Sequence, residues 1–285
     1  MLVFCFKLGR FCMGDWHEYC FINLCIIREV LKINMNKVCI ITGAASGIGL
    51  TSSEFFSKEG YKVIMADINK EKLIIESEKL GADYFLADLS KRDECKALVD
   101  FTLKKYSKVD VLINVAGIQT VCPIDEFSED IWDFMISLML TAPFLLTKYV
   151  WGSMKDHMWG RIININSIHG LVASEYKSAY VSAKHGLSGL TKTAALEGGR
   201  FGITVNSICP SYVNTPLVDS QINDQAKTHG ITNDQVIEEI MLKKSSIKTL
   251  IEPDEVVELI KLLCSDQGRH ITGSLISVDG GWTAN

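Results

Sequence analysis

Two residues that share one face of a predicted helix, Tyr180 and Lys184, have the types and spacing for acid–base chemistry. They lie four positions apart in the stretch SAYVSAKHGL, and four residues make about one helical turn. A free phenol has a pKa of about 10, which is too high for a base at neutral pH. A neighbouring ammonium favours the phenolate, so we expect Lys184 to lower the pKa of Tyr180. Tyr180 would then act as general base toward an alcohol and as general acid in reverse.

A serine precedes this pair at a position where ligands bind in parallel sheets. Ser167 ends the apolar stretch GRIININS, 13 residues before Tyr180. Ligands of open α/β sheets bind at the carboxyl ends of the strands. We therefore expect Ser167 to hydrogen-bond the reacting oxygen. An isolated Tyr-x-x-x-Lys is more often a surface pair, so the elements around these residues have to decide between the two interpretations.

Those elements alternate between strands and helices from residue 37 onward. Short apolar runs separated by helical stretches are typical of βαβ crossovers and of a parallel sheet covered on both faces. The sequence predicts an α/β fold: one Rossmann-like, doubly wound sheet over residues 36–285. The expected strands are 37–42, 61–67, 83–88, 109–117, 160–167, 202–210 and 274–281. The expected helices are 47–58, 70–80, 92–106, 125–135, 138–157, 176–199 and 253–263, and the polar stretch 216–250 is predicted to be a helical lid over the substrate.

The first strand runs into a glycine-rich loop, TGAASGIGL, and then into a helix. Gly43, Gly47 and Gly49 let the backbone approach a pyrophosphate, and the helix N-terminus supplies free N–H groups. Asp67 ends the second strand, 18 residues after Gly49. Its carboxylate can accept hydrogen bonds from ribose hydroxyls and would repel a 2′-phosphate. Because no Arg or Lys follows Asp67 before Lys70, we expect NAD rather than NADP.

Composition limits the classes of partner. The 285 residues carry a net charge of −5, which gives no reason to expect nucleic acid or an anionic membrane as partner. The nine cysteines include no Cys-x-x-Cys pair, so reduced thiols in a cytoplasmic protein are the simplest interpretation. No His, Cys or Asp cluster has the spacing of metal ligands, and no metal is expected.

Residues 1–34 differ from the rest, with four of the nine cysteines. Their apolar run, 19–27, is about half the length of a membrane span, roughly 20 residues. We interpret Met35 as the natural start of the chain. An organelle-targeting or appended helical segment is the alternative.

Taken together, these motifs resemble the short-chain dehydrogenase/reductase family. The resemblance rests on TGAASGIG, on NVAG at 114–117, on Ser167 and on the Tyr180–Lys184 pair. It implies a homotetramer that interconverts alcohols and ketones with NAD(P), with Ser167, Tyr180 and Lys184 as catalytic residues. It also implies that the cofactor contacts Gly43, Ser46, Gly47, Ile48, Gly49, Asp67, Asp88, Leu89, Asn114, Ala116, Gly117, Tyr180, Lys184, Pro210, Val213 and Thr215.

Within that family, GRIININSIHGLVASEYKSAYVSAKHG and VDGGWTAN resemble the D-3-hydroxybutyrate dehydrogenases. Lys177 shares the face of Tyr180 and Lys184, and His169 would point with Ser167 if strand geometry continued that far. Cationic and donor groups beside the reacting centre suit a small hydroxy acid, since charge-assisted hydrogen bonds to a carboxylate are strong. The resemblance implies a carboxylate site of Gln119, His169, Lys177 and Gln221, with Ser167, Tyr180 and Tyr212 completing the substrate contacts.

Three positions depart from the family pattern. Met139 stands where the family has an asparagine that supports a water chain to the lysine, and a thioether cannot replace an amide in hydrogen bonding. Pro210 is followed by Ser211 rather than glycine, and Tyr212 replaces a tryptophan. Two other functions stay open: a 3-oxoacyl thioester reductase, which Asp67 and the cluster of donors disfavour, and a nucleotide-binding regulator without catalysis, which only Met139 favours.

Overall fold

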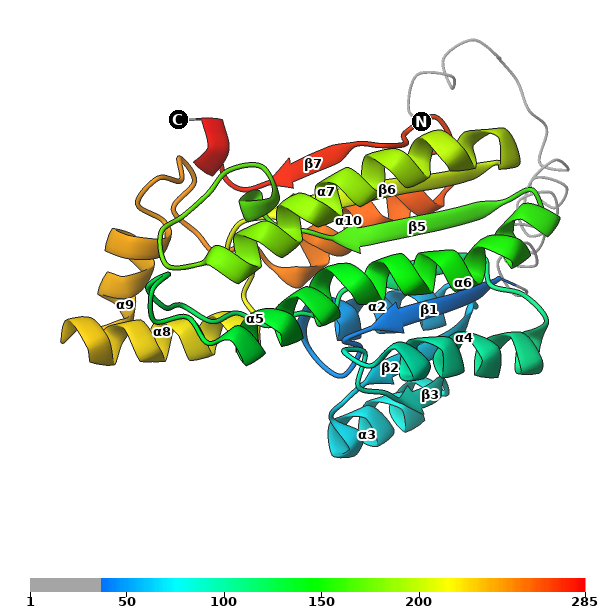
Figure 1. The fold of residues 1–285 in the computed structure, drawn as a ribbon, viewed down its shortest axis with the longest axis horizontal. Helices are drawn as coiled ribbons and strands as arrows, with labels where there is room; N and C mark the ends of the chain where they lie inside the picture. The colour runs from blue at the N-terminus through cyan, green and yellow to red at the C-terminus, as the bar shows by residue number, and fades with distance from the viewer. Residues whose placement is uncertain (1–36, 285) are drawn as a thin grey trace, which may run out of the picture.

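The computed structural model describes residues 37–284, so the expectation about residues 1–34 lies outside the described residues. Its centre is a seven-stranded parallel sheet in the order β3-β2-β1-β4-β5-β6-β7 (Figure 1). The strands are β1 (Val38–Thr42), β2 (Lys62–Asp67), β3 (Asp83–Leu86), β4 (Val111–Asn114), β5 (Gly160–Ile165), β6 (Ile203–Pro210) and β7 (Leu275–Val278). The predicted doubly wound sheet is confirmed. The strand order reverses between β1 and β4, which is where such sheets form a ligand crevice.

The strands are continuous apolar runs because helices cover both faces of the sheet. In β1, Val38 and Ile40 point into one hydrophobic cluster, whereas Cys39 and Ile41 point into the other. Figure 1 shows α4, α6 and α7 on one face and α2 and α10 on the other. The helices are α2 (Gly47–Lys58), α3 (Lys70–Leu80), α4 (Arg92–Tyr106), α5 (Glu129–Ile136), α6 (Ala142–Asp156), α7 (Ser178–Gly198), α8 (Pro216–His229), α9 (Asn233–Gln235) and α10 (Pro253–Cys264).

The two helices expected at 125–135 and 138–157 are one continuous helical segment. A π-helical turn, Ser137–Thr141, joins α5 to α6 without a break. Among the described residues this segment, Glu129–Asp156, is the one long and apolar enough to pass a length-and-hydropathy test for a membrane span. Buried side chains of α6, such as Leu146, Val150 and Met154, pack into the core against the sheet. Packing of α6 against the core therefore accounts for part of the hydropathy of this segment.

Two other boundaries differ from expectation. Helix α7 begins at Ser178, because Tyr176 adopts a left-handed conformation with φ of 63° that a helix cannot contain. The stretch predicted to be helical at 216–250 is helical only to residue 241: α8 is followed by α9 and a second π-helical turn, Val236–Met241. Its apolar residues, which include Val218, Ile222 and Val236, form a small core of their own.

Candidate active site

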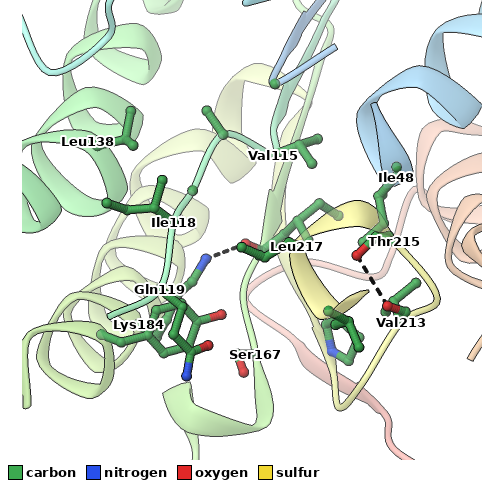
Figure 2. A pocket seen from close by; sticks show the side chains of 18 of the residues that line it. Ile48, Val115, Ile118, Gln119, Leu138, Ser167, Lys184, Val213, Thr215 and Leu217 are labelled. Carbon is green, nitrogen blue, oxygen red and sulfur yellow. Dashed lines mark hydrogen bonds between the residues drawn. The ribbon is translucent and has the colours of Figure 1, made fainter. Parts of the chain in front are cut away.

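A cleft of about 350 Å³ opens at the carboxyl ends of the strands. The β1–α2 loop, the segment after β4, the end of β5, α7 and the β6–α8 segment all contribute to its walls. Most of the predicted site residues line it: Gly43, Ser46, Gly47, Ile48, Asp67, Asp88, Leu89, Ala116, Gly117, Gln119, Ser167, His169, Lys177, Tyr180, Lys184, Pro210, Tyr212, Val213, Thr215 and Gln221. In Figure 2, Gln119, Ser167 and Lys184 gather at one end of the cleft, and Ile48, Val213 and Thr215 lie on the other side.

Two predicted cofactor residues lie behind the cleft wall instead. Gly49 packs against the β1–α2 loop, where a Cβ would collide with the carbonyl oxygen of Gly43. Asn114 is buried at the end of β4 and donates its amide hydrogen to Asn164 Oδ1 at 2.8 Å. Both residues shape the elements of the site without reaching its surface.

The structure brings the three predicted catalytic residues, Ser167, Tyr180 and Lys184, together in one part of the cleft, which is our candidate reaction centre. Helix α7 presents Tyr180 and Lys184 on one face, and the Lys184 ammonium lies 5.6 Å from the centre of the Tyr180 ring. Lys184 donates a hydrogen bond to the carbonyl oxygen of Ile165, at the end of β5, at 2.8 Å. Ser167 lies two residues beyond β5 and lines the same cleft as Tyr180. The predicted constellation therefore exists as a geometric unit.

The pKa of Tyr180 runs opposite to the expectation from sequence. Burial raises the pKa of Tyr180 to about 12, and the hydrogen bond with Ser167 opposes that rise. Burial also lowers the pKa of the Lys184 ammonium to about 8. The expected lowering of the Tyr180 pKa by Lys184 is not found: desolvation of the phenolate is the largest cause of the shift, and Lys184, which donates its hydrogen bond to Ile165, is not among the groups that shift it.

The glycine loop leaves room for a phosphate. Gly47 has φ of 51°, and a Cβ there would lie 2.9 Å from Thr215 Cγ2. The first turn of α2 carries no acidic residue, and its N-cap, Ser46, makes no side-chain capping bond. The helix N-terminus is thus left with N–H groups for an anion. These residues fit the pyrophosphate of a nicotinamide dinucleotide.

The Asp67 carboxylate is held at the edge of this loop by two backbone donors. Ala45 N–H donates to one carboxylate oxygen at 3.0 Å and Asn69 N–H to the other at 2.8 Å. Each oxygen can accept a further hydrogen bond, since a carboxylate accepts about four in all, and Asp67 lines the cleft. The fixed negative charge suits ribose hydroxyls and disfavours a 2′-phosphate.

The wall next to the reaction centre carries a cation and a donor that lacks an acceptor. Gln119 Nε2 is buried and has no hydrogen-bond partner among the described residues, while its Oε1 accepts a long bond, 3.5 Å, from Gln221. Lys177 is buried, and burial lowers the pKa of its ammonium to about 8. Tyr212 faces the same space, with its ring centre 5.8 Å from the Lys177 ammonium. Together they offer hydrogen bonds to an anion.

His169 reaches the cleft for a different reason than strand alternation. A short 3-10 turn, Ile168–Gly170, ends the extended backbone directly after Ser167. This turn brings His169 Nδ1 to 3.3 Å from Ser167 Oγ, while Nε2 lies 2.8 Å from Ser174 Oγ. Burial lowers the pKa of His169 to about 3, with Lys177 adding to the effect. The imidazole is therefore neutral at physiological pH.

Met139 occupies the interior beside α7. It lies in the π-helical turn, is buried, and packs in one cluster with Ala179, Ala183 and Tyr180. A Cβ on Gly117 would lie 3.4 Å from its sulfur. A thioether supports no proton transfer, so this side of Tyr180 is apolar.

Sequence motifs did not indicate the apolar lining of the cleft. Ile118, Leu138 and Leu217 line it (Figure 2), and no polar pattern marks such residues in advance. Trp282, near the chain end, lies with its ring centre 6.1 Å from that of His169. Among residues 37–284 no group of His, Cys, Asp or Glu is arranged to hold a metal ion.

The comparisons with known proteins agree with this fold and define the family. The sequence profile of the short chain dehydrogenase family matches residues 37–226, and the chain belongs to that family of oxidoreductases. It is 44% identical over 257 residues to a D-beta-hydroxybutyrate dehydrogenase of Rhizobium meliloti, covering 88% of this chain and all of the relative. A D-beta-hydroxybutyrate dehydrogenase of Cupriavidus necator is 39% identical, with 87% and 98% covered.

More distant relatives include enzymes named for other substrates. A 3-oxoacyl-[acyl-carrier-protein] reductase of Thermotoga maritima is 34% identical, with 86% of this chain and 97% of the relative covered. A crystal structure of a variant actinorhodin polyketide ketoreductase with NADPH superposes with a TM-score of 0.83 at 31% identity, covering 88% of this chain and 99% of that one. The family and the fold are thus common to relatives with different substrates.

Proposed function

We propose that this chain is an NAD-dependent dehydrogenase that interconverts D-3-hydroxybutyrate and acetoacetate. The observation that carries the proposal is the wall beside Tyr180: Gln119 and Lys177 line the cleft there, and Gln119 Nε2 has no hydrogen-bond partner among the described residues. A buried donor without an acceptor is costly in a free site and favours a ligand that supplies the acceptor. A carboxylate held there would place the neighbouring hydroxyl carbon beside Ser167 and Tyr180.

The residues at the reaction centre then divide the proton chemistry. Ser167 donates a hydrogen bond to the substrate oxygen, and Tyr180 exchanges a proton with that oxygen. With a pKa of about 12, Tyr180 holds its proton at neutral pH and is suited to protonate the carbonyl oxygen during reduction. Oxidation requires the phenolate, so its rate is expected to rise with pH. The nicotinamide supplies the hydride chemistry when bound.

Asp67 supports NAD over NADP in this proposal. Its carboxylate is fixed by two backbone N–H groups and would meet a 2′-phosphate with like charge. Tyr212 would contact the substrate from the segment between β6 and α8, and Gln221 would contribute from α8, the first helix of the proposed lid. We also propose a homotetramer in the cytoplasm, which the family resemblance supports.

Reduction of a 3-oxoacyl thioester is the second candidate, because relatives at 34% identity carry that name or that of acetoacetyl-CoA reductase. The two candidate reactions differ in cofactor, NAD or NADPH, and in whether the substrate carries a free carboxylate or a thioester next to the reacting carbon atoms. Purified protein should be assayed with D-3-hydroxybutyrate and NAD, and with acetoacetyl thioesters and NADPH. We expect a higher kcat/KM for the first pair by at least about a hundredfold. A preference for the thioester with NADPH would refute the proposal.

A further inference from the structure

A buried amide and a buried hydroxyl join the end of β5 to α7 beside the candidate reaction centre. Asn166, the second residue after neither strand nor helix begins to change, is replaced here by its plain position: it follows Ile165, the last residue of β5. Its Nδ2 donates a hydrogen bond to Ser188 Oγ on α7 at 2.9 Å, and its Oδ1 accepts the backbone N–H of Ser167 at 3.0 Å. Both Asn166 and Ser188 are buried. We call this pair the β5–α7 link.

The direction of each hydrogen bond in the β5–α7 link is fixed by groups that have only one role. The backbone N–H of Ser167 can only donate, so the amide atom that faces it is the oxygen, and Nδ2 is left to donate to Ser188. The single hydroxyl hydrogen of Ser188 faces two carbonyl oxygens, that of Gly170 at 2.9 Å and that of Lys184 at 3.1 Å. Because carbonyl groups can only accept, the hydrogen bonds run in one direction from β5 to these carbonyls.

The β5–α7 link also holds the 3-10 turn, Ile168–Gly170, against the helix. Gly170 ends that turn, and a Cβ there would lie 2.5 Å from Asn166 Oδ1. The turn and the amide are therefore packed with no space between them. Ser188 lies four residues, about one helical turn, after Lys184. The link thus fixes three elements to one another: the end of β5, the 3-10 turn and the first half of α7.

A second connection of the same kind lies behind the wall of the cleft. Asn164 Nδ2 on β5 donates to Thr191 Oγ1 on α7 at 2.9 Å, and Thr191 Oγ1 lies 2.8 Å from Ser207 Oγ on β6. Asn166 lines the cleft, whereas Asn164 and Thr191 do not. Both connections stabilise the packing of α7 on the sheet. Only the β5–α7 link also holds a predicted catalytic residue, through its bond to the Ser167 backbone.

We infer that Asn166 and Ser188 are positioning residues whose hydrogen bonds hold Ser167 at the place where it meets the reacting oxygen. The inference rests on the proposed alcohol–ketone chemistry. That chemistry requires Ser167 and Tyr180 to contact the same oxygen atom, and a displacement of about 1 Å can lower the rate by about a hundredfold. Ser188 is not among the residues that line the cleft, so removal of its hydroxyl should slow the chemical step without removing a group that touches substrate.

Hydrogen exchange tests the β5–α7 link without any substrate. In Ser188→Ala protein we expect the backbone N–H groups of residues 167–171 to exchange at least about tenfold faster than in wild type, because that segment opens locally when the link is lost. Thr191→Val is the matched control: it also removes one buried hydroxyl from α7 and should leave the exchange of this segment unchanged. Unchanged exchange at residues 167–171 in Ser188→Ala would overturn the inference, whatever the substrate proves to be.

Kinetics with D-3-hydroxybutyrate and NAD test the consequence for catalysis. Ser188→Ala and Asn166→Ala should each lower kcat about tenfold, and the Kd of NAD for Ser188→Ala should stay within about twofold of wild type. The double variant should be no slower than the slower single variant, because both changes break the same link.

The control variant separates positioning from general stability. Thr191→Val should lower the midpoint of chemical denaturation about as much as Ser188→Ala does, since each leaves a buried amide without its acceptor, but it should keep the wild-type kcat. A wild-type kcat in Ser188→Ala, or an equal loss of kcat in Thr191→Val, would contradict the positioning role.

Discussion

Burial dominates the electrostatics of the titratable side chains at the reaction centre. It raises the pKa of Tyr180 to about 12 and lowers the pKa of both Lys177 and Lys184 to about 8. Spacing along a helix predicted correctly that Tyr180 and Lys184 meet. It could not predict how far each group is removed from water, and that term decides the direction of the pKa shift.

At this scale the first prediction concerns Tyr180 itself. Tyr180→Phe removes the group that exchanges the proton but keeps the ring packed in its cluster. We expect kcat to fall by roughly 10² to 10⁴, the usual contribution of a positioned acid or base, with NAD affinity unchanged. Steady-state kinetics and a direct binding titration measure the two effects. Retention of more than a tenth of the wild-type kcat would remove Tyr180 from the mechanism.

The second prediction concerns the charge on Lys177. Below pH 8 the ammonium is protonated, and we expect it to bind the substrate carboxylate; as pH rises through about 8, the charge is lost and KM for D-3-hydroxybutyrate should increase. Lys177→Met should raise KM roughly 10- to 100-fold at pH 7, the range for a hydrogen bond to a charged group, and should abolish the pH dependence. Lys72→Met, on an exposed position of α3, is the matched control. An unaltered KM profile in Lys177→Met would show that no anion binds there.

At the scale of elements, turns decide where the site residues lie. The strand-then-helix pattern indicated the sheet, the glycine loop and the position of Asp67, because these follow from local periodicity and spacing. The 3-10 turn that ends β5 and the left-handed Tyr176 that delays α7 have no such signal. His169 was therefore placed in the right cavity by an incorrect argument from strand alternation.

Packing within the nucleotide loop constrains one of its glycines. Gly49 lies behind the loop, where only a hydrogen atom fits against the Gly43 carbonyl, and its contact with a cofactor stays a prediction. Crowding of this kind depends on how two turns pack and is not visible in a glycine pattern. The sequence likewise gives no sign that the Asn114 amide donates its hydrogen bond to Asn164 inside the sheet.

Replacement of Gly49 tests this packing. Gly49→Ala should displace the β1–α2 loop, weaken NAD binding at least about tenfold and lower the free energy of unfolding by roughly 1–3 kcal/mol through overpacking. The matched control is Gly152→Ala in α6, where no atom lies near the added methyl; helix propensity predicts a gain of up to about 1 kcal/mol there. Titration calorimetry measures the NAD affinity of each variant, and chemical denaturation measures its free energy of unfolding. Wild-type NAD affinity in Gly49→Ala would mean that the loop tolerates the methyl group.

At the scale of the whole molecule, the helices on the α4–α6–α7 face carry exposed apolar side chains. Leu196 on α7 is 87% exposed and Phe144 on α6 is 46% exposed. Single exposed apolar residues are common, but both lie on the long helices that Figure 1 shows running along one face of the sheet. This surface is our candidate for the subunit contact of the proposed homotetramer.

Sedimentation analysis tests that assembly. We expect the wild type to have four times the mass of one chain, and Leu196→Asp to shift it to smaller species, because a charge would be buried in the contact. Ile75→Asp, at an exposed position of α3, should leave the assembly intact. A monomeric wild type, or a Leu196→Asp protein that remains a tetramer, would contradict the proposed interface.

The central claim is that a carboxylate-binding wall beside Tyr180 makes this short-chain dehydrogenase act on a small hydroxy acid. The most direct test compares kcat/KM for D-3-hydroxybutyrate and for its uncharged methyl ester, with NAD, in wild-type and Lys177→Met protein. We expect wild type to prefer the acid by at least about a hundredfold, since a site built for a charged partner rejects analogues that leave it unpaired, and the preference should shrink in Lys177→Met. Equal turnover of acid and ester by the wild type would contradict the claim.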